Sequence, residues 1–228
     1  MQRRLRSNFS HQFESNIWKI HAFEASNYII IEIRDQEKLQ VEFAVINMED
    51  DVLEKTIALD EPWWASVDRV AGDMIIFFTF DEEDIAEPRH FLGYSIKDAK
   101  PLWERDVIPT AAEISQQNNS IVLPFLYHEG SEYFDTVDHF INTYFKRKIT
   151  RACNYLEWGN HIIISYFYEK EGIISNRLIV TDQEANVLLD ENLGDFKEGI
   201  TDNTFFIFNN KLIFVKGVTD FFIYDLKP

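Results

Sequence analysis

The sequence predicts an all-β protein built from repeated four-stranded antiparallel units, and three observations carry this prediction. A short turn rich in Gly, Ser, Asn or Asp recurs five times in the 228 residues. Each turn precedes a run of β-branched and aromatic residues, which is typical of strands. The second residues of the turns lie at 27, 73, 119, 160 and 210, with gaps of 46, 46, 41 and 50. A period of about 40–50 residues with such runs predicts a single β-propeller of five blades.

The five turns and the strand-forming runs that follow them can be read directly from the sequence. The turns are Ser26-Asn27, Gly72-Asp73, Asn118-Asn119, Gly159-Asn160 and Asn209-Asn210. The runs begin at Tyr28, Met74, Ile121, Ile162 and Leu212. In the second unit we expect four strands, over residues 65–71, 74–80, 89–96 and 102–106.

A second periodic feature lies about twenty residues after each turn, and its clearest copy runs from Gly93 to Trp103. This copy resembles the quinoprotein-type propeller repeat, in which a small residue and a Trp ten residues later tie adjacent blades together. Ser95, Asp98 and Ala99 stand where that repeat has Asp, Thr and Gly. The rhythm is also similar to that of WD-like propellers and of propeller-like families of unknown function in Bacteroidetes. The resemblance implies a blade architecture, and it implies no particular function.

The third unit is expected to be irregular or partly helical. Phe134, Val137 and Ile141 recur at helical spacing within residues 128–150. Pro124 also interrupts the preceding apolar run, where it would forfeit a ladder hydrogen bond.

The chain ends one strand short of a complete last blade, and the N-terminal strand around residues 16–20 can supply it. We therefore expect Trp18 and Ile20 to pair with the strand around Ile223, which closes the ring and covers two strand edges. This organisation gives a flexible tail over residues 1–14 and one propeller domain over 15–228. The alternative is an open sheet or a sandwich with accidental periodicity.

The composition limits the classes of partner. A formal charge of −17 repels phosphate backbones and anionic lipid, so we expect neither nucleic acid nor membrane as a partner. The charge suits a basic protein or small cationic ligand, or it serves solubility alone. The single cysteine, Cys153, excludes an intrachain disulfide, and no apolar run is long enough to span a bilayer. We expect a cytoplasmic monomer.

No catalytic constellation is evident in the sequence. The six histidines show no metal-binding spacing, and there is no phosphate-binding loop and no nucleophile elbow. Cys153 lies in an apolar and aromatic stretch that suggests a buried, inert thiol. We therefore predict no catalytic residue, no metal and no cofactor, and favour a binding module over an enzyme.

The candidate binding site is an acidic loop face with exposed tryptophans. In a propeller, the loops between the second and third strands of each blade open on one face, together with the connections between blades. Strand alternation cannot bury two adjacent tryptophans on one side of a sheet. The predicted ligand-binding residues are Trp63, Trp64, Glu83, Asp84, Glu132, Glu169 and Glu171. They suit a protein or small cationic ligand, although solvated loops with tryptophans buried between blades are the simpler interpretation. The alternative function is a carbohydrate-active hydrolase or lyase with paired carboxylates.

Overall fold

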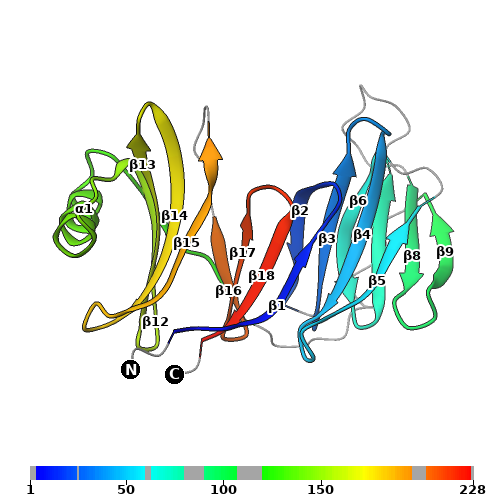
Figure 1. The fold of residues 1–228 in the computed structure, drawn as a ribbon. Helices are drawn as coiled ribbons and strands as arrows, with labels where there is room; N and C mark the ends of the chain where they lie inside the picture. The colour runs from blue at the N-terminus through cyan, green and yellow to red at the C-terminus, as the bar shows by residue number, and fades with distance from the viewer. Residues whose placement is uncertain are drawn as a thin grey trace. The chain divides into compact units, whose positions relative to one another are not determined.

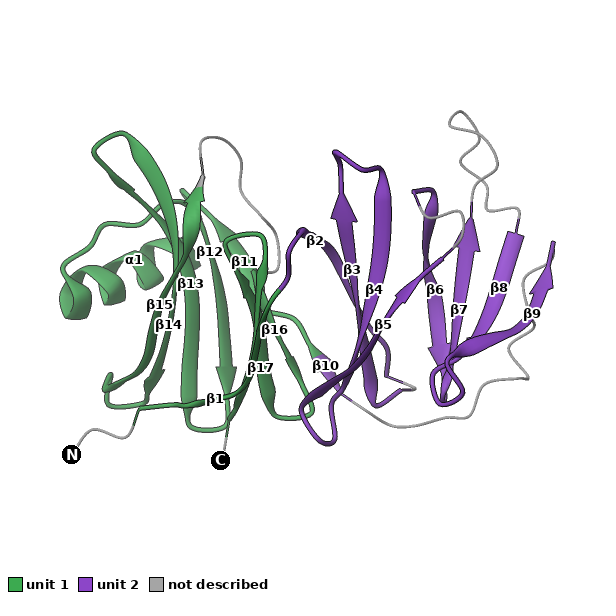
Figure 2. Ribbon diagram, turned by 45° about the vertical axis from the view of Figure 1, so that its right-hand side comes forward, with its two compact units in different colours: residues 1–12, 122–228 green, residues 13–121 purple. Residues whose placement is uncertain are grey.

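The computed structural model describes residues 4–24, 26–59, 63–79, 90–106, 120–196 and 204–226. These residues form mostly antiparallel strands and one short helix, so the all-β prediction is confirmed (Figure 1). The chain divides into two compact units, where we expected a single domain (Figure 2). Unit 1 contains residues 1–12 and 122–228, and unit 2 contains residues 13–121. The helix of the described residues is too short to cross a membrane.

Unit 2 consists of two four-stranded antiparallel sheets in which each strand pairs with its sequence neighbour. The first sheet contains β2 (Asn16–Ala22), β3 (Tyr28–Asp35), β4 (Gln40–Asn47) and β5 (Val52–Ala58). The second contains β6 (Ala65–Ala71), β7 (Met74–Thr79), β8 (His90–Ser95) and β9 (Lys100–Arg105). The four strands expected in the second repeat are therefore confirmed. β8 ends one residue earlier and β9 begins two residues earlier than expected, and the expected ends at residues 80 and 89 lie outside the described residues.

The two sheets of unit 2 share one hydrophobic core. Phe43 of β4 and Phe77 of β7 are fully buried, and their ring centroids lie 4.7 Å apart. Ile30 and Ile75 belong to the same core. Burying a side chain of this size stabilises the fold by about 1.5–3 kcal/mol. The apolar runs after the turns are thus the central strands of the sheets.

Four of the five predicted turns precede strands as expected. β3, β7, β13 and β17 begin within one residue of the turn, and the turn at Asn118-Asn119 lies outside the described residues. Gly72, Gly159 and Asn210 have φ values of 61°, 57° and 64°. These left-handed conformations explain the preference for Gly and Asn at these positions.

Unit 1 contains two five-stranded sheets. One contains β11 (Phe125–His128), β12 (Thr150–Trp158), β13 (His161–Lys170), β14 (Ile173–Asp182) and β15 (Val187–Phe196), in that order. The order of the other is β1-β18-β17-β16-β10. Its strands are β1 (Ser7–Gln12), β18 (Asp220–Asp225), β17 (Lys211–Lys216), β16 (Phe205–Phe208) and β10 (Ile121–Val122), the last at the boundary with unit 2.

Helix α1 (Glu132–Phe145) connects β11 and β12, which confirms the expectation of a partly helical third repeat. The Ser131 hydroxyl caps its first turn by accepting a hydrogen bond from the Phe134 amide at 3.3 Å. Lys146 ends the helix in the left-handed conformation. The helix buries Val137 and Ile141 in a core that includes Tyr166 of β13.

We expected five four-stranded blades, and this number is wrong, because the described residues form four sheets. The part of the third repeat that the structure describes, from residue 120 on, builds no sheet of its own. Its first strand, β10, joins the sheet of β16–β18, and its second strand, β11, joins β12, with Pro124 between them. The remainder of this repeat is α1. A proline and two short strands leave too few ladder hydrogen bonds for a separate sheet.

An N-terminal strand does complete the last sheet, but it is not the one we expected. β1 pairs with β18, with Phe9 opposite Ile223 and His11 opposite Phe221. Trp18 instead lies in β2, which pairs with β3. Residues 7–12 thus form a strand within the stretch expected to be a flexible tail. Phe9 is the only apolar residue of this strand, and it packs edge-on against Phe221 with 6.4 Å between ring centroids. One apolar residue in six gives no alternating pattern from which the sequence could predict a strand.

Gly93 and Trp103, the best-preserved positions of the second periodic feature, are direct partners on β8 and β9. The indole lies over the glycine so closely that a Cβ atom at Gly93 would come within 2.3 Å of its Cε2 atom. Trp103 is half-buried, and the guanidinium of Arg105 lies 4.8 Å from its ring centroid. The small residue therefore makes room for the tryptophan within a single sheet.

Candidate functional site

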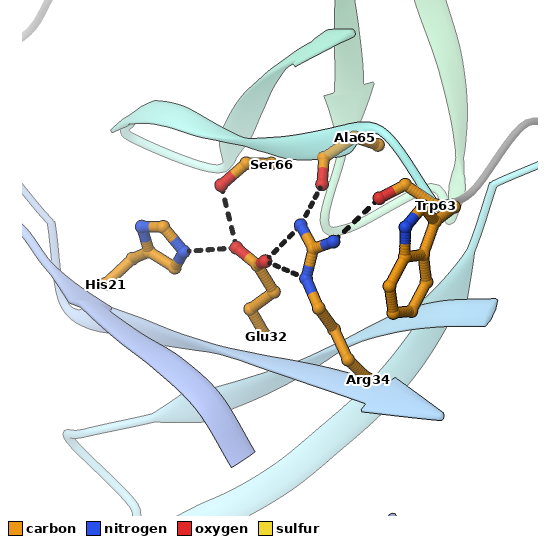
Figure 3. Close-up of polar contacts among 6 residues, drawn as sticks. All are labelled: His21, Glu32, Arg34, Trp63, Ala65 and Ser66. Atoms are coloured by element: carbon orange, nitrogen blue, oxygen red, sulfur yellow. Dashed lines mark hydrogen bonds and ion pairs between the residues drawn. The ribbon is translucent and has the colours of Figure 1, made fainter. Parts of the chain in front are cut away.

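A carboxylate at the centre of unit 2 organises a dense cluster of polar side chains (Figure 3). Glu32 of β3 is 1% exposed and follows three buried isoleucines, Ile29 to Ile31. Its Oε2 atom lies 2.9 Å from Nε2 of His21 and accepts a hydrogen bond from the Ser66 hydroxyl at 2.7 Å. Its Oε1 atom accepts from Nε of Arg34 at 2.7 Å. We call these four residues the Glu32 network.

Burial and hydrogen bonding have opposite effects on the pKa of this carboxylate. Burial alone would raise the pKa of Glu32. The hydrogen bonds from His21, Ser66 and Arg34 favour the ionised form and outweigh burial, so the pKa lies below its ordinary value. Glu32 is therefore a buried anion, and both of its carboxylate oxygens accept hydrogen bonds.

Arg34 connects the first sheet of unit 2 to the second. Its guanidinium donates to the carbonyl of Trp63 at 2.7 Å and to the carbonyl of Ala65 at 3.1 Å. The same group lies 5.3 Å from the ring centroid of Trp18 and 5.1 Å from that of Trp63. An arginine between two indoles, with its donors on carbonyls and a carboxylate, is well suited to hold the sheets together.

The Glu32 network contains the three residue types of a hydrolase triad, but in the wrong order. Nucleophilic catalysis requires the histidine between the serine and the carboxylate, so that the imidazole takes the proton of the hydroxyl. Here Glu32 lies between Ser66 and His21, and the Ser66 hydroxyl donates its hydrogen bond directly to the carboxylate. The network is therefore a structural clamp and does not activate a nucleophile.

A depression of about 260 Å³ lies at the other end of the same strands. It is formed where three turns meet, at the start of β3, the end of β4 and between β6 and β7. Its lining is polar and acidic, with one aromatic ring, and consists of Asn27, Tyr28, Asn47, Glu49, Gly72 and Asp73. We call this feature the acidic depression.

Carboxylates in and around the acidic depression affect the pKa of the Tyr28 phenol. Burial raises the pKa of Tyr28, and the negative charges of Glu54, Asp73, Glu49 and Asp50 raise it further. Asn47 holds this arrangement, because its side chain donates to Glu54 at 2.8 Å and accepts from the Glu49 amide at 2.9 Å. The site thus combines a negative potential with an aromatic ring and amide groups.

The sequence-predicted site residues are distributed over both units. Trp63 and Trp64 belong to unit 2, where Trp63 covers Arg34 and Trp64 is 42% exposed. Glu132 is exposed in the first turn of α1, and Glu169 and Glu171 are exposed near the β13–β14 turn. The strand register places these three residues at the same end of one sheet. Glu83 and Asp84 lie outside the described residues.

Cys153 is fully buried, as its sequence context suggested. Burial raises the pKa of its thiol to about 12, so the group is protonated and unreactive at neutral pH. The described ranges contain no group of three His, Cys, Asp or Glu side chains that could hold a metal ion.

Sequence reasoning missed both the Glu32 network and the acidic depression. One signal for the first was visible, since a glutamate interrupts a run of isoleucines in β3. Two of its partners, His21 and Ser66, lie 11 and 34 residues away along the chain, and only the packing of the two sheets brings Ser66 to it. The depression is built by turn residues that sequence reasoning interpreted only as turns.

Comparison with known proteins provides little functional information. Residues 22–103 match a family described as a domain of unknown function, DUF4905. The match covers most of unit 2, including Glu32, Arg34 and the whole acidic depression. No curated protein matches the chain. Among solved structures, BamB from Moraxella catarrhalis aligns over 97% of this chain and 99% of its own, with 8% identity and a TM-score of 0.29.

Proposed function

We propose that the protein is a non-enzymatic binding module for a cationic group, carried by a basic protein or a small ligand. The observation that carries this proposal is the acidic depression of unit 2. An ammonium or guanidinium group placed there would meet the carboxylates of Glu49 and Asp73, the amide oxygens of Asn27 or Asn47, and the ring of Tyr28. Carboxylates, carbonyl oxygens and an aromatic face are the groups that recognise organic cations.

The charge of the whole chain supports the same ligand class. A net charge of −17 attracts cations from a distance and speeds their association. In unit 1, the exposed carboxylates of Glu132, Glu169 and Glu171 are further proposed contacts for a cation. In unit 2, Glu83, Asp84, Trp63 and Trp64 remain proposed contacts, and Trp64 is the more exposed of the two tryptophans.

One observation favours the alternative of a carbohydrate-active hydrolase or lyase. Glu49 and Asp73 line the same depression, and paired carboxylates are what glycoside hydrolysis requires. An enzyme of this kind would cleave a chromogenic glycoside and lose that activity in Asp73→Asn. A pure binding module would show no turnover with any glycoside and would still bind cations.

The proposal is tested by calorimetric titration of the full chain with arginine ethyl ester and with tetramethylammonium. We expect saturable binding that weakens as salt rises, because the attraction is screened over about 8–10 Å. Asp73→Asn should weaken binding by about threefold to tenfold, as expected for one charge contact. Glu104→Gln is the matched control, since it removes one exposed carboxylate of β9, outside the depression. Equal effects of the two substitutions, or no saturable binding, would contradict the proposal.

A further inference from the structure

Four aromatic side chains of unit 1 form one contiguous group, in which Tyr127 contacts each of the other three. Phe125 and Tyr127 of β11 lie with ring centroids 6.5 Å apart and planes 6° apart. Tyr133 of α1 stacks on Tyr127 at 5.2 Å, and Tyr155 of β12 lies 6.3 Å from Tyr127. Phe125 is 65% exposed and Tyr133 is 64% exposed. We call these four residues the aromatic row.

The fold explains why the aromatic row is left open. Phe125 is opposite Tyr155, and Tyr127 is opposite Cys153, so these side chains share the face of the sheet on which α1 packs. The helix covers Cys153 but leaves the ring of Phe125 in solvent. β11 is also the edge strand of this sheet. Single exposed apolar residues are normal on protein surfaces, whereas a contiguous row of rings marks an interaction site.

Acidic groups lie beside the row. The Tyr155 hydroxyl donates to Glu157 at 2.5 Å, and Glu157 is exposed. Burial raises the pKa of Tyr155, and this hydrogen bond raises it further, so the phenol stays protonated. Glu132 and Asp135 are exposed in the first turn of α1, next to Tyr133. A ligand of the aromatic row therefore meets aromatic rings with negative charge beside Tyr155 and beside Tyr133.

We propose that the aromatic row binds a proline-rich segment of a basic partner in the polyproline II conformation. Proline-rich segments in this conformation dock on surfaces lined by aromatic rings, and the exposed rings of Phe125 and Tyr133 offer such a surface. Proline rings pack well on aromatic faces, and the helix loses little entropy on binding because it is already formed. The carboxylates of Glu157, Glu132 and Asp135 select basic residues beside the prolines. This site lies in unit 1, so it is independent of the acidic depression.

The test uses a fluorescently labelled peptide of repeated Pro-Pro-Arg and measures its anisotropy with the full chain. Three residues per turn place all arginines of this peptide on one face and the prolines on the other two. We expect saturable binding, weakened about tenfold or more by Tyr133→Ala, as for the loss of a central aromatic contact. Tyr133→Phe, which keeps the ring, should bind within about twofold of the unmodified chain. Tyr144→Ala is the matched control, because Tyr144 is an equally exposed tyrosine of the same helix that contacts Phe140 and is not part of the row.

Two further peptides separate the parts of the proposal. A Ser-Ser-Arg repeat keeps the charge without the polyproline conformation, and a Pro-Pro-Glu repeat keeps the conformation with the opposite charge. Both should bind at least about tenfold more weakly than Pro-Pro-Arg. Equal binding of Ser-Ser-Arg, or equal losses in Tyr133→Ala and Tyr144→Ala, would overturn the proposal. Binding of cello-oligosaccharides that depends on Tyr133, with no peptide binding, would assign the row to carbohydrate and also overturn it.

Discussion

Replacing Arg34 by methionine removes the charge that holds Glu32 and keeps a side chain of similar length. The substitution breaks the contact of the guanidinium with the Glu32 carboxylate at 2.7 Å. It also removes the two donors to the carbonyls of Trp63 and Ala65 and the stacking against Trp18. Unit 2 would then retain a buried carboxylate with His21 and Ser66 as its hydrogen-bonding partners.

The expected loss in the free energy of unfolding follows from the burial of the Glu32–Arg34 ion pair. Removing one partner of a buried ion pair costs about 3–5 kcal/mol, because the other charge is left buried without compensation. Glu32 keeps two hydrogen bonds, so we expect the lower end, about 3 kcal/mol in the free energy of unfolding. The double variant Glu32→Met with Arg34→Met should recover much of this loss, since no buried charge remains.

Urea unfolding followed by tryptophan fluorescence measures these differences, because Trp18 and Trp63 lie against Arg34. The pH dependence gives a second readout. The pKa of Glu32 is lowered in the folded protein, so its stabilisation is present above the ordinary value of 4.5 and is lost as pH falls through the folded pKa. The difference between the unmodified chain and Arg34→Met should therefore shrink in acid.

Arg105→Met is the control, because Arg105 stacks on Trp103 in the same unit and is exposed. Its cost should stay within about 1 kcal/mol. The reasoning is refuted if Arg34→Met costs no more than Arg105→Met. It is also refuted if the double variant is less stable than Arg34→Met alone.

Three further predictions concern packing, reactivity and the N-terminal strand. Gly93→Val should displace Trp103 and cost about 1–3 kcal/mol, and the cost should fall when Trp103→Leu is added; equal costs in both backgrounds would contradict the close packing. Cys153, with a pKa of about 12, should resist iodoacetamide at pH 8 until urea unfolds unit 1, so rapid labelling of the native chain would show that the thiol is not buried. Removal of residues 1–12 deletes β1 and exposes the edge of β18, which should cause aggregation in light scattering; a monomer with unchanged melting would show that β1 contributes nothing.

The sequence predicted the local structure of unit 2 well because its signals are local. Turns such as Gly72-Asp73 need left-handed backbone, and the runs after them supply the central strands. The helix over 132–145 was also visible, from the spacing of Phe134, Val137 and Ile141. In each case residues close in sequence determine the conformation.

Features that depend on long-range pairing were not predictable in the same way. β1 has a polar sequence and becomes a strand by pairing with β18, more than 200 residues away. The third repeat divides its two short strands between neighbouring sheets, which no local periodicity reveals. The predicted site residues were chosen from a ring geometry, and the two candidate sites that the structure offers rest instead on contacts between sheets and turns.

Chemical-shift mapping by NMR tests the central claim, that unit 2 binds a cationic group in the acidic depression. The isotopically labelled full chain would be titrated with arginine ethyl ester at low salt. We predict saturable shifts centred on the amides of Tyr28, Asn47, Glu49 and Asp73, and their loss in Asp73→Asn. Shifts spread over the exposed carboxylates of either unit with no centre at the depression, or shifts unchanged by Asp73→Asn, would contradict the claim.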